Sequence, residues 1–448
     1  MLKTLRKGQI KIAQFLGREP ALRAALLQRI WGVASGPVTA TLIVAFIGPV
    51  EQGYYFAFLS LGAIVMFFEL GFGQIIVQSM IHAVSNNKEL RGGRQLVGEE
   101  EAIVARVARR WYVTAGVLFA LTALVSGYWW FDHRTSSTDN WRFAWLFYVA
   151  GMGANLGVGG SVAIIEGLGD VALVYRLRLV SSVGGALALW GTIVSGGGYY
   201  GLAAQQGVQL VVTCWFIAPL TRDLRSLTPV PFAVMRSYWY ERLWPLQWRS
   251  AIVVGSSFFI YQGTTLIAFR LLGPVDGGKV GFAITIGNML ASLVLIGVSV
   301  NSVKFGALAA RKEWPEFDRQ FKFYVWYGLV AGFAAAILVS GLLWLVVVWG
   351  VVDGARFLPQ IGLWCIFLAS LTAALAQTLI IRMRCLRREP FARQNFIAAL
   401  VWPFVAVGLG TYFGIAGVAA GYLGLIVLGL AIPLYIKLRM HEREWRTS

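Results

Sequence analysis

Long apolar runs separated by short polar breaks follow one another along most of the chain. A helix needs roughly 20 mainly apolar residues to cross the hydrocarbon core of a bilayer. Within that core a helix satisfies its own backbone hydrogen bonds, whereas an open sheet does not. The runs therefore predict an all-α polytopic membrane protein with twelve transmembrane helices, near residues 28–47, 53–82, 111–131, 143–165, 179–195, 200–219, 250–272, 280–303, 323–350, 359–381, 394–413 and 416–436.

Composition and charge agree with this interpretation. The chain is 58% hydrophobic and 13% charged, which is too apolar for a soluble protein of this size. Its 39 Lys and Arg exceed its 21 Asp and Glu, for a formal net charge of +18. If the amino terminus is cytoplasmic, 34 of these basic residues fall inside and 5 outside, as the positive-inside rule requires. The basic charge thus needs no nucleic-acid partner, and both termini are expected in the cytoplasm.

The topology divides the chain into two lobes joined by a linker. The connections expected on the outside are about ten residues at most, so no outer domain fits in them. A longer inner connection follows the sixth span and separates the halves. The predicted parts are a basic amphipathic cytoplasmic segment (1–26), an amino-terminal six-helix lobe (27–219), a cytoplasmic linker (220–249), a carboxy-terminal six-helix lobe (250–436) and a cytoplasmic tail (437–448).

A short motif occurs twice. "GPVEQG" begins at Gly48 and "GPVDGG" at Gly273, 225 residues later, and each joins the first two spans of its lobe. Gly-Pro ends one helix, and an acid near the start of the next favours the positive end of its dipole. This shared position, with Arg29 and Arg249 entering the preceding helices, indicates a duplication. Two six-helix bundles related by a pseudo-two-fold axis along the membrane normal, with a cavity between them, resemble an alternating-access transporter.

The first hairpin also carries a family resemblance. "GPVEQGYYFAFLSLGAIVMFFELGFGQIIVQ" resembles the Wzx-like oligosaccharide and polysaccharide flippases of the multidrug/oligosaccharidyl-lipid/polysaccharide (MOP) exporter superfamily. The similarity is specific over about the first 80 residues and topological beyond them. It implies a multi-pass protein of the bacterial inner membrane that moves polyprenyl-diphosphate-linked oligosaccharide outward for surface polysaccharide assembly. Membrane lipids and other polysaccharide-assembly proteins are the further partners that it implies.

A lipid-linked diphosphate calls for cations, and arginine meets phosphate oxygens in pairs. Arg29 and Arg249 are the leading candidates for binding it, with a role as interfacial anchors as the alternative. Arg178, Arg270 and Lys304 also lie near span ends, where snorkelling to the interface explains them.

Glu69 is the most deeply placed charge, about sixteen residues into the second span. An ionisable group at such depth is costly, and it suggests a proton or cation relay or a partner for a cavity arginine. A structural ion pair or a protonated, hydrogen-bonded side chain is the competing explanation. Glu166 lies nearer the cytoplasmic boundary and is weaker support for such a site. Coupling to protons or to sodium is left open.

Glutamines at helical spacing could bind the glycan. Gln74 and Gln78 share one face of the second span, as Gln205 and Gln209 do on the sixth. Hydrogen bonding between helices is the alternative. Glu69 is five residues from Gln74, so in a continuous helix it lies on a different face and away from the same cavity wall.

Motifs for other chemistry are missing from the sequence. It has no phosphate-binding loop for ATP, no zinc-ligand spacing and no nucleophile elbow, so no catalytic residue, metal or cofactor is expected. The glycines of "GMGANLGVGGSVAIIEG" are expected to serve close helix packing. Three rivals to a flippase stay open: a drug or cation antiporter of the same superfamily, a membrane enzyme of glycan assembly, and a scaffold for envelope assembly.

Overall fold

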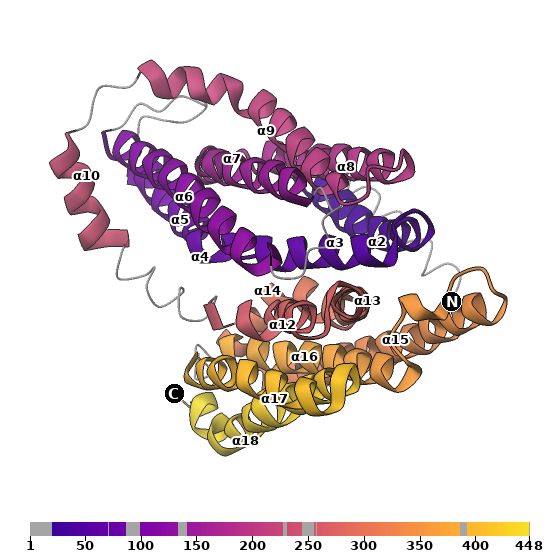
Figure 1. Ribbon diagram of the computed structural model, residues 1–448. Coiled ribbons are helices and arrows are strands. Elements are labelled where there is room, and N and C mark those ends of the chain that lie inside the picture. Colours follow the sequence, from indigo (N-terminus) through magenta and orange to yellow (C-terminus); the bar gives the residue numbers. More distant parts are fainter. Residues whose placement is uncertain are drawn as a thin grey trace, which may run out of the picture. The chain divides into compact units, whose positions relative to one another are not determined.

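The computed structural model describes residues 20–69, 71–86, 99–132, 141–226, 231–243, 255–256, 258–385 and 392–447. Helices account for nearly all of them (Figure 1). The helices fall into two units. Unit 1 holds α2 (Pro20–Phe46), α4 (Val65–Glu69), α5 (Phe72–Asn86), α6 (Glu99–Phe131), α7 (Trp141–Gly167), α8 (Val171–Val194), α9 (Tyr200–Ser226), α10 (Phe232–Tyr238) and the π-helix η2 (Trp239–Leu243).

Unit 2 holds the carboxy-terminal helices and one helix from early in the chain. Its members are α3 (Pro49–Gly62), α12 (Gly263–Leu272), α13 (Pro274–Val300), α14 (Ser302–Ala310), α15 (Trp314–Val348), η3 (Gly354–Arg356), α16 (Gln360–Cys385), α17 (Ala392–Gly424), η4 (Leu425–Ala431) and α18 (Ile432–Thr447). The units thus differ from the lobes drawn on the sequence at α3, since Ile47–Ala63 groups with the carboxy-terminal half.

Each of the twelve expected spans contains a helix in the described part of the chain. Within the described ranges, nine helical segments are long and apolar enough to cross a membrane. The shorter apolar helices Ile30–Phe46 and Gly263–Leu272 correspond to the expected first and seventh spans. The last segment, Gln394–Glu442, is 49 residues long and contains two expected spans, because the backbone turns back at Gly414 (φ 60°, ψ −143°).

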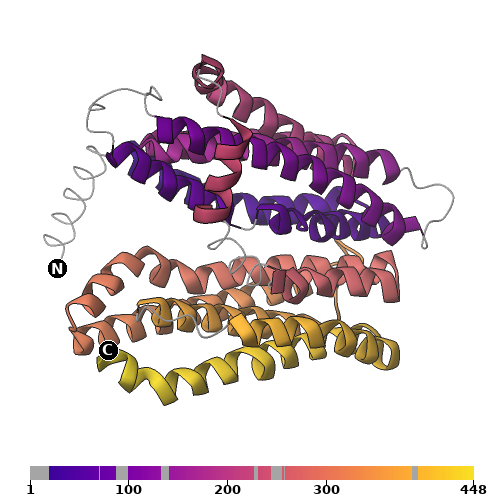
Figure 2. The ribbon, with the colours of Figure 1, turned by 90° about the vertical axis from the view of Figure 1, so that its left-hand side faces the viewer.

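Glycines bring the helices of unit 1 close together. A methyl group added at Gly116 of α6 would lie 2.3 Å from the backbone oxygen of Gly153 on α7. One added at Gly160 would lie 2.9 Å from the ring of Tyr112. The prediction that the glycine-rich stretch of the fourth span serves helix packing is therefore confirmed. Figure 2 shows α6 and α7 running alongside each other.

The repeated motif begins α3 and α13 in the same way. Pro49 and Pro274 each occupy the first helical turn, with Glu51 or Asp276 in the same turn. Within unit 2 these two helix starts pack against each other. A methyl group on Gly53 would lie 2.1 Å from the backbone oxygen of Pro274, which only a glycine permits.

Candidate functional site: a polar cavity in unit 1

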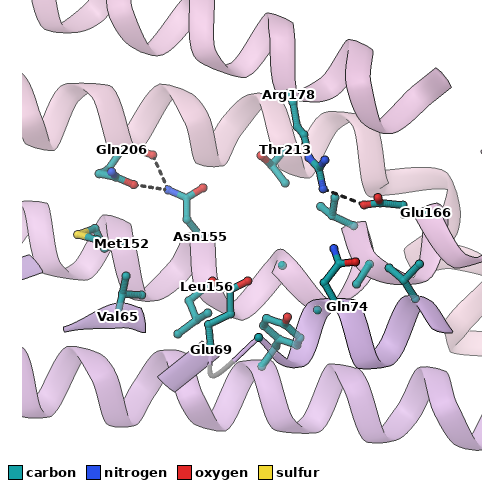
Figure 3. Close-up of a pocket in the computed structure, with 17 residues that line it drawn as sticks. Val65, Glu69, Gln74, Met152, Asn155, Leu156, Glu166, Arg178, Gln206 and Thr213 are labelled. Carbon is teal, nitrogen blue, oxygen red and sulfur yellow. Dashed lines mark hydrogen bonds and ion pairs between the residues drawn. The ribbon is translucent and has the colours of Figure 1, made fainter. Parts of the chain in front are cut away.

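A cavity of about 380 Å³ opens among α4 to α9 of unit 1 (Figure 3). One part of its lining is apolar and includes Val65, Met152 and Leu156. The polar part combines charged, amide and hydroxyl side chains. These are Glu69, Gln74, Tyr112, Asn155, Glu166, Arg178, Gln206 and Thr213.

Glu69 and Gln74 line the same cavity, so the expectation that Glu69 lies away from that wall is wrong. In a continuous helix, residues five apart differ by about 140° in direction. Here α4 ends at Glu69 and α5 begins at Phe72, with Gly71 between them at φ 69°. The left-handed glycine resets the helix phase and directs both side chains into the cavity.

Glu166 and Arg178 form an ion pair on the cavity lining. The Arg178 Nη2 donates to the Glu166 Oε2 at 2.8 Å, across the hairpin between α7 and α8. Gly169 (φ 91°) turns the chain, and the Asp170 side chain caps α8 by accepting from the Leu173 N–H at 3.2 Å. The Arg178 and Glu166 side chains are 39% and 19% exposed, so the cavity reaches both. Arg178 is thus bound to a carboxylate on the cavity lining, so snorkelling to the membrane interface does not by itself explain its position.

Asn155 and Gln206 form an amide pair between α7 and α9. The Asn155 Nδ2 donates to the backbone oxygen of Gln206 at 2.9 Å and to its Oε1 at 3.0 Å. It also donates to the Gly151 oxygen at 3.0 Å. No group in the described ranges bonds to the Asn155 Oδ1 or the Gln206 Nε2. The pair therefore offers the cavity one acceptor and one donor.

The glutamines expected to bind glycan separate into two groups. Gln74 lines the cavity, whereas Gln78 is exposed elsewhere on α5. Gln205 and Gln209 pack against α8, where a methyl group on Gly185 would lie 3.2 Å and 2.9 Å from their Cγ atoms. Their neighbour Gln206 faces the cavity instead.

The two arginines expected to bind diphosphate cannot be compared with this cavity. Arg29 lies in α2, but its side chain is outside the described part of the chain, as is all of Arg249. Residues 1–19 of the amphipathic segment also lie outside the described ranges.

Sequence reasoning missed Tyr112, Asn155, Gln206 and Thr213. A signal existed for one of them, because Asn155 is the only amide in the expected span 143–165. For Tyr112 and Thr213, many residues of the same type occur along the spans. Nothing in the sequence separates these two from the others.

Comparison with known proteins identifies the fold. No family model and no curated protein matches the chain. A solved structure of a multidrug resistance MATE family transporter of the MOP superfamily, in its inward-facing conformation, is 14% identical, with a TM-score of 0.65 over 96% of this chain and 99% of that one. The fold is that of the MATE transporters. A mutant of the Vibrio cholerae MATE transporter VcmN is 13% identical, with a TM-score of 0.54 over 96% of this chain and 98% of that one.

The MATE-like fold confirms the predicted fold class. MATE transporters have twelve transmembrane helices in two bundles, as expected here. The first of these neighbours is a MATE family transporter of the MOP superfamily, and at 14% identity the likeness shows the fold alone and does not reach the Wzx-like branch. The chain is therefore a polytopic membrane protein with the fold of the MATE transporters.

Proposed function

We propose that this protein is an alternating-access flippase that moves polyprenyl-diphosphate-linked oligosaccharide across the bacterial inner membrane, with both termini in the cytoplasm. The observation that carries the proposal is the cavity of unit 1, where three amide side chains and two hydroxyls face one space. Amides and hydroxyls both donate and accept hydrogen bonds, as sugar hydroxyl groups require. The transporter fold and the resemblance of the first hairpin to flippases support the same conclusion.

Arg178 supplies a cation for the diphosphate. In the structure its guanidinium is bound to Glu166, and the pair is open to the cavity. A diphosphate that enters can share Arg178, because a guanidinium has five N–H donors and Glu166 uses only part of them. Arg29 and Arg249 remain proposed as a further clamp, which Arg→Lys and Arg→Ala variants test. Transport per inserted molecule is expected to follow the order Arg, Lys, Ala, whereas interfacial anchors would accept lysine as well as arginine.

A cation or drug antiporter is the second candidate, and Glu69 favours it. The cavity holds two carboxylates, Glu69 and Glu166, against one guanidinium, Arg178. A surplus carboxylate attracts a cationic substrate or a coupling ion, either a proton or sodium. In the flippase, the same Glu69 acts as the coupling group.

The deciding experiment deletes the gene for this protein in its host. It then measures on which leaflet of the inner membrane the lipid-linked sugar accumulates. For the flippase we expect this sugar to accumulate on the inner leaflet, and the wild-type chain to restore its export. Reconstituted vesicles provide the second arm, in which a fluorescent lipid-linked oligosaccharide and a cationic dye are offered separately. Uptake of the dye with no movement of the lipid would identify the antiporter. Polysaccharide-assembly proteins are proposed to receive the exported product.

A further inference from the structure

The linker between the two halves is partly fixed on unit 1. The indole of Trp239, in η2, stacks on that of Trp111 in α6, with 4.5 Å between ring centroids and 28° between planes. The centre of the Phe72 ring lies 5.1 Å from that of the Trp239 indole. Figure 2 shows α10 passing crosswise in front of α6. These aromatic contacts hold η2, and with it α10, beside α6, a helix long and apolar enough to cross a membrane.

Exposed arginines surround this junction. Arg109 and Arg110 are exposed on α6, and Arg236 is exposed on α10. Among the described residues no carboxylate pairs with any of the three. The Arg110 guanidinium lies 4.8 Å from the centre of the Phe232 ring, and Glu241 accepts from the Ser237 hydroxyl at 2.6 Å. The junction therefore carries concentrated positive charge.

Two hollows flank the junction, with volumes of about 310 Å³ and 360 Å³. Both are lined by Arg110, Thr114 and Met235. The first adds Arg236 and the aromatic rings of α10 and η2, and the second adds Arg109. Each hollow thus combines apolar walls with at least two guanidinium groups.

An apolar stripe leads away from the arginines along α6. Val113, Val117 and Leu121 recur every four residues and are 49%, 55% and 58% exposed. They lie within the candidate span Glu100–Phe131, where lipid is the expected surrounding. The surface therefore changes over two helical turns from cationic to apolar, as a phospholipid changes from headgroup to acyl chain.

We propose that the α6–α10 junction binds an anionic glycerophospholipid of the membrane. The phosphate is held by Arg110 of α6 and Arg236 of α10, which both line the first hollow. An acyl chain follows Val113 and Val117 along α6. Guanidinium groups form strong paired hydrogen bonds with phosphate oxygens. Each basic side chain near an anionic membrane surface raises the affinity for that surface about severalfold. This site is separate from the cavity, and the proposal does not rest on flippase activity.

The test measures lipid binding to the full-length protein by native mass spectrometry. Phosphatidylglycerol and phosphatidylcholine with identical acyl chains are offered in equal amounts. The double variant Arg110→Gln/Arg236→Gln removes two charges at the junction. Its matched control, Arg311→Gln/Lys322→Gln, removes two exposed charges in unit 2. Thermal unfolding of each variant confirms that the fold is intact.

We expect the wild-type protein to prefer phosphatidylglycerol by about tenfold, and the junction variant alone to lose that preference. If the control variant lost this preference equally, the preference would come from general surface charge, and the proposed site would be wrong. Competition by glycerol phosphate as strong as that by the lipid would overturn the role of the acyl chain. Tighter binding of a polyprenyl diphosphate than of phosphatidylglycerol would show that the occupant is not a glycerophospholipid.

Discussion

Units 1 and 2 use charged side chains in opposite ways. In unit 1, Glu69, Glu166 and Arg178 line a cavity, and the Arg178 side chain is 39% exposed. In unit 2, Arg382 of α16 is only 10% exposed and joins Asp318 of α15, at 2.6 Å, to Glu442 of α18. Unit 1 thus keeps its charges accessible to a cavity, whereas unit 2 uses a buried arginine to hold three helices together. We therefore place substrate binding and ion coupling in unit 1.

The largest expected effect tests the fastening role in unit 2. Arg382→Ala leaves Asp318 and Glu442 without their shared cation and removes a guanidinium that lies 5.3 Å from the Phe317 and Phe321 rings. Breaking such a buried pair costs about 3 kcal/mol of stability, measured as thermal unfolding in detergent. Arg319→Ala removes a 77% exposed partner of Glu316 and should cost less than about 0.5 kcal/mol. Equal midpoints for the two variants would contradict the fastening role.

The next effect concerns the packing of the repeated motifs. Gly53→Ala places a methyl group 2.1 Å from the Pro274 oxygen, so α3 has to move away from α13. Overpacking of this kind costs about 1–3 kcal/mol, again measured by thermal unfolding. Gly48→Ala is the control, because no atom lies within 4 Å of its added methyl group. If Gly53→Ala is as stable as Gly48→Ala, the close crossing does not hold unit 2 together.

The accessible charges of unit 1 are expected to affect transport more than stability. Glu69→Gln keeps the shape of the side chain and its hydrogen bonding but removes the charge. Transport per inserted molecule should fall about tenfold, or roughly 1.4 kcal/mol, and should lose its pH dependence. Glu51→Gln, at an exposed position in the first turn of α3, is the control. Unchanged transport across pH would make Glu69 a structural residue.

The smallest effect compares two neighbouring glutamines. Gln206→Leu removes the Oε1 that accepts from Asn155 and the free Nε2, while the backbone acceptor of Gln206 remains. Loss of one hydrogen bond of about 1 kcal/mol should lower glycan-dependent transport about fivefold. Gln205→Leu changes a side chain that packs on Gly185 outside the cavity lining, and transport should persist. If Gln205→Leu lowered transport more than Gln206→Leu, the glycan would bind at the helix face that carries Gln205 and Gln209.

The fold could be predicted because its signals are local. Apolar length gives the spans, and Gly-Pro followed by an acid gives the starts of α3 and α13. The grouping of α3 with unit 2 could not be read in this way, because it depends on which helix packs against Gly53.

The site was less accessible to sequence reasoning, since helical periodicity fixes relative faces only while a helix continues. The turn at Gly71 changed the phase between Glu69 and Gln74. On α9 the spacing correctly paired Gln205 with Gln209 on one face, but it did not reveal that this face meets α8. The Glu166–Arg178 pair required the geometry of the α7–α8 hairpin.

The turn at Gly414 has a consequence for how the chain is made. The two helices that it joins belong to one helical segment of 49 residues, more than twice the length that crosses a bilayer. No polar loop separates them, so the ribosome delivers a nearly continuous apolar stretch to the insertion machinery. We expect the two helices to leave the translocon together as a closed hairpin. A residue with a side chain at Gly414, where φ is 60° and ψ is −143°, would delay that folding back.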